Sequence, residues 1–73
     1  MKQSEKDKLR VLLDYWVRHN KEHAEEFREW AEKAKGFGDD ALSEELAAAA
    51  REMEKTNASL ARALTRLDAG AGG

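Results

Sequence analysis

The sequence predicts an all-α protein, an antiparallel two-helix hairpin that dimerises into a four-helix bundle. Two observations predict this fold. Ala, Glu, Lys, Leu and Arg supply 44 of the 73 residues, about 60%, and there is no Pro, which is a composition typical of long helices. Apolar residues also recur at alternating steps of three and four in two long segments, the heptad period of packed helices.

The first helix is predicted over residues of about 4–35. Ser4–Asp7 has the pattern of a capping box, in which a hydroxyl satisfies early backbone N–H groups and a carboxylate follows three residues later. Gly36–Gly38 ends the helix, because glycine takes the left-handed conformation easily and Phe37 is placed to fold back onto the last turn.

The second helix is predicted over residues of about 40–68, with Asp39 and Asp40 supplying its N-cap. The loop 36–39 is so short that only an antiparallel hairpin can form. Residues 69–73 are expected to be a flexible tail. The whole chain, 1–73, is therefore predicted to be a single helical-hairpin domain.

Each helix has an apolar seam with a heptad period. On the first helix the predicted seam is Leu9, Leu13, Trp16, Asn20, His23, Phe27, Trp30 and Ala34. On the second helix it is Ser43, Leu46, Ala50, Met53, Asn57, Leu60, Leu64 and Leu67. Folding the chain at Gly38 places Trp16 opposite Leu60 and Trp30 opposite Leu46. We therefore expect Trp16, Phe27 and Trp30 to be core residues.

Further apolar residues lie beside both seams and predict self-association. They are Leu12, Tyr15 and Val17 on the first helix, and Leu42, Ala49 and Ala61 on the second. These residues widen the apolar arc beyond the stripe that one hairpin buries. A chain of this size without disulfides also rarely gains more than about 3–5 kcal/mol from a single core. A homodimer that forms a four-helix bundle would cover the wider apolar arc and enlarge the hydrophobic core.

Charge and composition exclude several function classes. Thirteen basic and fifteen acidic residues are interspersed and give a net charge of −2, so neither a nucleic acid nor an anionic membrane is an expected partner. There is no Cys, and no apolar run of about 18 residues or signal-peptide pattern, so we expect a cytoplasmic protein. No catalytic triad or phosphate-binding loop is present, and the protein is not expected to be an enzyme.

A polar patch interrupts the middle of the first seam. His19, His23 and Glu26 fall within about 60° of one another on a helical wheel. A His-x-x-x-His pair places two imidazoles one turn apart, where they can chelate a divalent metal, and Glu26 can supply a third ligand. Imidazole with carboxylate suits zinc, nickel, cobalt or ferrous iron.

The same patch has a purely structural interpretation. Asn20 and Asn57 are predicted to lie opposite each other in a polar layer, and a buried Asn pair can fix helix register and oligomeric state at a cost in stability. In this interpretation His23 hydrogen-bonds to Asn57 and His19 is half-exposed. Spacing alone favours this structural role over a metal site.

Residues 12–27, LLDYWVRHNKEHAEEF, resemble a small helical-hairpin domain of anaerobic bacteria and archaea. The second-helix pattern from Met53 through Asn57 to Leu64 is similar as well, and the resemblance covers residues of about 8–67. That domain often occurs beside His-rich segments in proteins linked to nickel or cobalt handling. The resemblance implies that the characteristic polar residues are His19, Asn20, His23 and Asn57.

Together these observations predict a non-enzymatic binding or oligomerisation module. The resemblance links it to nickel or cobalt homeostasis, and the His-x-x-x-His pair extends the possible ions to zinc. The alternative is a structural protein–protein interaction hairpin, whose Asn/His layer sets register and oligomeric state.

Overall fold

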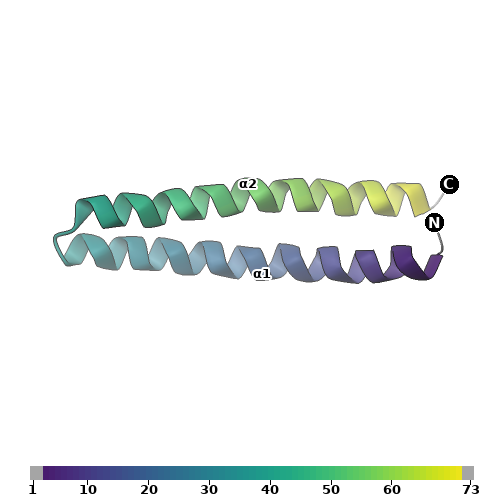
Figure 1. Ribbon diagram of the computed structural model, residues 1–73, viewed down its shortest axis with the longest axis horizontal. Helices are drawn as coiled ribbons and strands as arrows, with labels where there is room; N and C mark the ends of the chain where they lie inside the picture. Colours follow the sequence, from purple (N-terminus) through teal and green to yellow (C-terminus); the bar gives the residue numbers. More distant parts are fainter. Residues whose placement is uncertain (1–2, 72–73) are drawn as a thin grey trace.

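The chain folds into two long helices joined by one tight turn, within residues 3–71 that the computed structural model describes; side chains are described for residues 4–70. Helix α1 spans Gln3–Gly36 and helix α2 spans Asp40–Ala71. They lie side by side and antiparallel in a rod of 54 × 14 × 13 Å (Figure 1). The predicted all-α hairpin is confirmed. Over the described residues, neither helix has an apolar stretch long enough to cross a membrane.

Both helices extend beyond their predicted bounds. Helix α1 already includes Gln3, so Ser4 lies within its first turn and does not cap it, contrary to the prediction. Helix α2 continues to Ala71, because no Pro follows Asp68 and the single Gly70 disfavours the helix by only about 1 kcal/mol. Residues 69–71 of the predicted tail are therefore helical, and residues 72–73 lie outside the described part of the chain.

Hydrogen bonds in the turn satisfy backbone groups at the end of α1 and at the start of α2. The Asp39 N–H donates to Ala34 O at 3.2 Å and the Gly38 N–H to Lys35 O at 2.9 Å, which together form a Schellman motif. Gly38 has a φ of 82°, the left-handed conformation that this motif requires. The Asp39 carboxylate then accepts from the Leu42 N–H at 3.0 Å. Asp39 therefore caps α2, as predicted.

The interior of the hairpin is narrow and consists mainly of small side chains. The buried hydrophobic residues are Leu13, Ala24, Ala31, Ala34 and Ala50, and no large side chain is fully buried among the described residues. Alanines at these positions allow the two helix backbones to approach closely. The predicted seam of α2 is confirmed, since each of its eight residues from Ser43 to Leu67 is buried or half-buried.

The seam of α1 is rotated relative to the prediction. Leu13, Asn20, Phe27 and Ala34 face α2 as expected, but Val17, Ala24 and Ala31 complete the seam. The prediction that Trp16 and Trp30 are core residues is wrong for the hairpin, because they are 38% and 50% exposed. Indole rings do not fit between two helices that alanines hold close together, and they lie at the flank instead.

Polar contacts between the helices fix the antiparallel register. The buried Ser43 hydroxyl donates to Ala31 O at 2.7 Å, and the Asn57 side chain donates to Val17 O. Arg28 also forms an ion pair with Glu54. Nearer the open end of the hairpin, the Arg10 guanidinium donates to the Asp68 carboxylate at 2.6 Å. This hydrogen bond raises the pKa of Arg10 above its usual value.

Candidate functional site

Helix α1 has a continuous apolar surface that α2 does not cover. We define this apolar face by Leu9, Leu12, Trp16, His19, His23 and Trp30; the steps are three and four as far as His23, and Trp30 follows seven residues later. On a helical wheel these six residues lie within about 80° of one another. Leu12 is 45% exposed and Trp30 is 50% exposed, and the Lys33 ammonium lies 4.2 Å from the Trp30 ring. The hairpin therefore presents a stripe of large side chains to its surroundings.

The two histidines lie at the middle of this face with their ring nitrogens turned toward each other. His19 Nε2 and His23 Nε2 are 2.9 Å apart, and the two rings are nearly perpendicular, at 88°. Tyr15 stacks on His19 with a centroid distance of 5.2 Å, and Phe27 stacks on His23 at 6.0 Å. These aromatic neighbours hold both imidazoles in place along one line of the helix.

Stacking by Tyr15 and Phe27 was not predicted from the sequence. The signal was present, because residues 15, 19, 23 and 27 all carry rings and follow one another at steps of four. Side chains four residues apart on a helix lie one above the other. The heptad pattern instead predicted Tyr15 at the flank of the seam and Phe27 in the core.

Glu26 lies beside the histidines but not between them. Its Oε1 atom is 3.3 Å from Nδ1 of His23, on the edge of the ring opposite to the nitrogen that faces His19. In a single chain the three predicted ligands therefore do not converge on one point. Within the described part of the chain, no group of three or more His, Cys, Asp or Glu residues is arranged to hold a metal ion.

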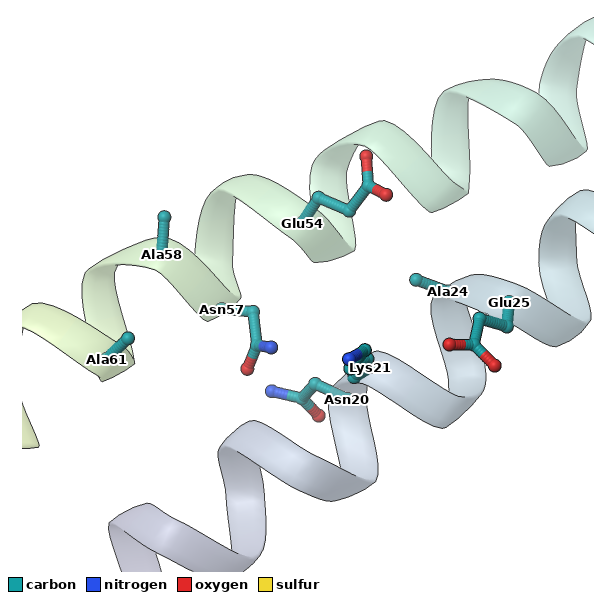
Figure 2. A pocket seen from close by; sticks show the side chains of 8 residues that line it. All are labelled: Asn20, Lys21, Ala24, Glu25, Glu54, Asn57, Ala58 and Ala61. Atoms are coloured by element: carbon teal, nitrogen blue, oxygen red, sulfur yellow. The ribbon is translucent and has the colours of Figure 1, made fainter.

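The predicted polar layer lies on a different side of α1. Figure 2 shows the Asn20 and Asn57 side chains turned toward each other across the helix interface. They border a shallow depression of about 280 Å³, which Lys21, Glu25 and Glu54 also line. Helical geometry places Lys21 and Glu25 on the side of α1 away from the apolar face.

Asn57 is only partly satisfied in this layer. Its Nδ2 donates to Val17 O at 2.9 Å, whereas its buried Oδ1 has no hydrogen-bond partner among the described residues. The predicted hydrogen bond between His23 and Asn57 is not present, because His23 faces the flank and contacts His19, Glu26 and Phe27. The asparagines and the histidines are therefore two separate features.

Residues 9–67 match a protein family described as "Domain of unknown function (DUF8180)". The chain belongs to this family. No curated protein and no solved structure matches the chain. The DUF8180 match includes the turn and most of both helices, so it covers the apolar face, the histidine pair and the asparagine layer together.

This DUF8180 hairpin has two elements of different chemistry outside its core. The apolar face offers large side chains for contact with another protein surface. The histidine pair presents two imidazole nitrogens, Nε2 of His19 and Nε2 of His23, 2.9 Å apart. The asparagine layer, by contrast, lies between the helices, where Asn57 donates to the main chain of α1.

Proposed function

We propose that this DUF8180 chain is a non-enzymatic self-association module, in which two hairpins pack through their apolar faces into a four-helix bundle. The observation that carries the proposal is the contrast between interior and surface. The buried hydrophobic core consists of one leucine and four alanines, whereas both tryptophans are 38–50% exposed. A second copy is the occupant that would cover them.

The size of the core supports a second copy as the occupant. Hydrophobic burial contributes roughly 25 cal/mol per Å² of apolar surface, and alanine side chains carry little such surface. A chain of 73 residues without disulfides ordinarily needs oligomerisation to reach useful stability. Dimerisation would bury apolar surface of Leu9, Leu12, Trp16 and Trp30. It would thereby supply the hydrophobic burial that the single hairpin lacks.

The middle of the apolar face is partly self-complementary, which also supports a symmetric dimer. Reversing the direction of α1 about position 21 pairs four of the six face positions with one another, Leu12 with Trp30 and His19 with His23, whereas Leu9 falls opposite Lys33. Leu12 then falls opposite Trp30 of the partner subunit, and Trp16 falls opposite Glu26 of the partner subunit. A two-fold interface requires such a self-complementary patch. We therefore propose that the two α1 helices pack antiparallel, with the turns at opposite ends of the bundle.

Charge is consistent with this packing. The formal charges at steps that continue the face include two acidic and two basic residues, Glu5, Glu26, Lys8 and Lys33. Both signs occur, and Lys33 already lies over the Trp30 ring. No run of like charges would therefore be brought together when two faces meet.

The test is the mass of the protein in solution, measured by sedimentation equilibrium for the unaltered chain and two variants. The unaltered chain is expected at twice its mass of 8.2 kDa. Trp16→Glu places a charge in the centre of the interface and should shift the protein toward monomer. Val11→Glu is the matched control, because Val11 is exposed, at 68%, but lies off the apolar face.

Two results would overturn this function. One is a monomer of unchanged helicity at high micromolar concentration. The other is equal loss of the dimer in the Trp16 and Val11 variants, which would place the contact elsewhere. Circular dichroism of each variant separates loss of the dimer from loss of the helices.

A further inference from the structure

We propose that pairing of the two apolar faces creates a site for one divalent transition-metal ion, held by His19 and His23 of both copies. This inference rests on the proposed self-association. In the proposed site, Glu26 is not a ligand but a hydrogen-bond acceptor behind His23. Four imidazole nitrogens would then surround the ion at the two-fold axis.

The separation of the two ring nitrogens fits a shared ion. A metal holds imidazole nitrogens at about 2.0–2.1 Å, so two neighbouring ligands are about 2.9 Å apart at right angles and about 3.4 Å apart in a tetrahedron. The observed distance between His19 Nε2 and His23 Nε2 is 2.9 Å. The pair therefore binds an ion with at most a small outward movement of the rings.

The position of Glu26 prepares His23 for this role. Since Glu26 Oε1 lies 3.3 Å from His23 Nδ1, the carboxylate favours the tautomer with its proton on Nδ1. The lone pair of His23 Nε2 is then directed at His19, which without metal donates its Nε2 proton to it. A carboxylate behind a ligating histidine is a common arrangement in metal sites, where it orients the ring and raises its basicity.

His19 must change tautomer when the ion binds. Its Nε2 proton moves to Nδ1 through solvent, so that both Nε2 atoms present lone pairs to the metal. No net proton is released from a neutral pair in this exchange. The stacked Tyr15 ring, 14° from parallel with His19, holds the plane of the imidazole while the tautomer changes.

Symmetry brings the second pair of ligands to the same place. Reversing α1 about position 21, the midpoint between His19 and His23, pairs these two histidines with each other and Leu12 with Trp30. His19 therefore falls opposite His23 of the partner subunit, and His23 falls opposite His19 of the partner subunit. Each copy alone supplies two ligands, and the dimer supplies four.

The donor set defines the class of ion. Imidazole nitrogens suit zinc, nickel, cobalt and copper, whereas calcium and magnesium prefer oxygen ligands. Apolar side chains on both sides of the histidines would limit access of water to the ion. The proposed ligand is therefore a borderline divalent transition metal such as Zn²⁺ or Ni²⁺.

The experiment is isothermal titration of the full chain, stripped with chelator, using Zn²⁺ and Ni²⁺ separately. We expect saturable binding of one ion per two chains and no binding of Mg²⁺. His19→Ala and His23→Ala should each abolish binding, since each removes two of the four ligands. Circular dichroism of each variant, recorded beforehand, must give an unchanged helical content.

Glu26→Gln tests the positioning role of the carboxylate. Loss of a carboxylate behind a ligating histidine lowers metal affinity about 10–100-fold, and the stoichiometry should remain one ion per dimer. Glu25→Gln is the matched control, because it makes the same change one residue away, where Glu25 lines the depression on the other side of α1. It should leave the affinity unchanged.

The outcomes separate this inference from the proposed function. A stable dimer that binds neither ion overturns the metal site and leaves self-association intact. Binding of one ion per chain overturns the shared site. A monomer that binds no ion overturns both proposals. Equal affinities for the Glu25 and Glu26 variants would contradict the role assigned to Glu26.

Discussion

The Asn57 side chain crosses the helix interface and donates from Nδ2 to the main-chain oxygen of Val17 at 2.9 Å. The same side chain leaves its buried Oδ1 atom without a hydrogen-bond partner among the described residues. One half of this amide therefore ties α2 to α1 at a single register, while the other half is destabilising. A buried polar group of this kind contributes specificity at the expense of stability.

Replacement of both asparagines by leucine should raise stability and reduce specificity. Asn20→Leu with Asn57→Leu removes the unsatisfied oxygen and adds apolar surface, so we expect the free energy of unfolding to rise by about 1–3 kcal/mol. Urea denaturation measures this change. Sedimentation should show a mixture of oligomers, because the asparagine layer then no longer fixes the register in the middle of the hairpin. Lower stability with an unchanged dimer would refute this role for the layer.

The two glycines of the turn should respond in opposite ways to alanine. Gly38→Ala should destabilise the hairpin by about 1–2 kcal/mol, because Gly38 has a φ of 82°, in the left-handed region. Gly36 is the last residue of α1, and Gly36→Ala should stabilise it by about 0.5–1 kcal/mol. A built Cβ meets no described atom within 4 Å at either position, so steric contact does not explain the difference. Thermal unfolding of both variants measures the two effects. Equal effects would contradict the prediction that they have opposite signs.

Ser43 should contribute to stability through its hydroxyl. It is 5% exposed and donates to Ala31 O at 2.7 Å. Ser43→Ala removes the hydrogen bond between the helices and should lower the free energy of unfolding by about 1 kcal/mol. Ser59→Ala, on an exposed part of α2, is the control and should have an effect close to zero. If the two variants unfold at the same urea concentration, the buried hydrogen bond makes no net contribution to the free energy of unfolding.

Most of the fold follows from local features of the sequence. The helix spans, the turn at Gly38 and the cap at Asp39 depend on composition and on a few adjacent residues, and they are close to the predictions. The seam of α2 was also predicted, since its apolar residues form a single stripe. On α1 two overlapping stripes satisfy the heptad period. The pattern alone could not tell which of them faces α2, and the close helix packing selects Ala24 and Ala31 over Trp16 and Trp30.

The histidine pair could be located from the sequence, but its geometry could not. Spacing along a helix places His19, His23 and Glu26 near one another. It does not determine which edge of each ring meets its neighbour, because this depends on side-chain rotation. In the structure Glu26 meets Nδ1 of His23 and His19 meets Nε2. Glu26, which was predicted as the third metal ligand, therefore contacts His23 instead.

Metal binding should also stabilise the folded dimer, provided that the ion binds only the native state. At free zinc of about 100 times Kd, binding contributes about 2.7 kcal/mol. For a dimer of two such chains this corresponds to a rise in Tm of about 5–10 °C. Circular dichroism melting with and without zinc measures the shift, and a chelator should reverse it. His23→Ala should melt at the same temperature in both conditions. A zinc-dependent shift that persists in this variant would place the ion away from the histidine pair.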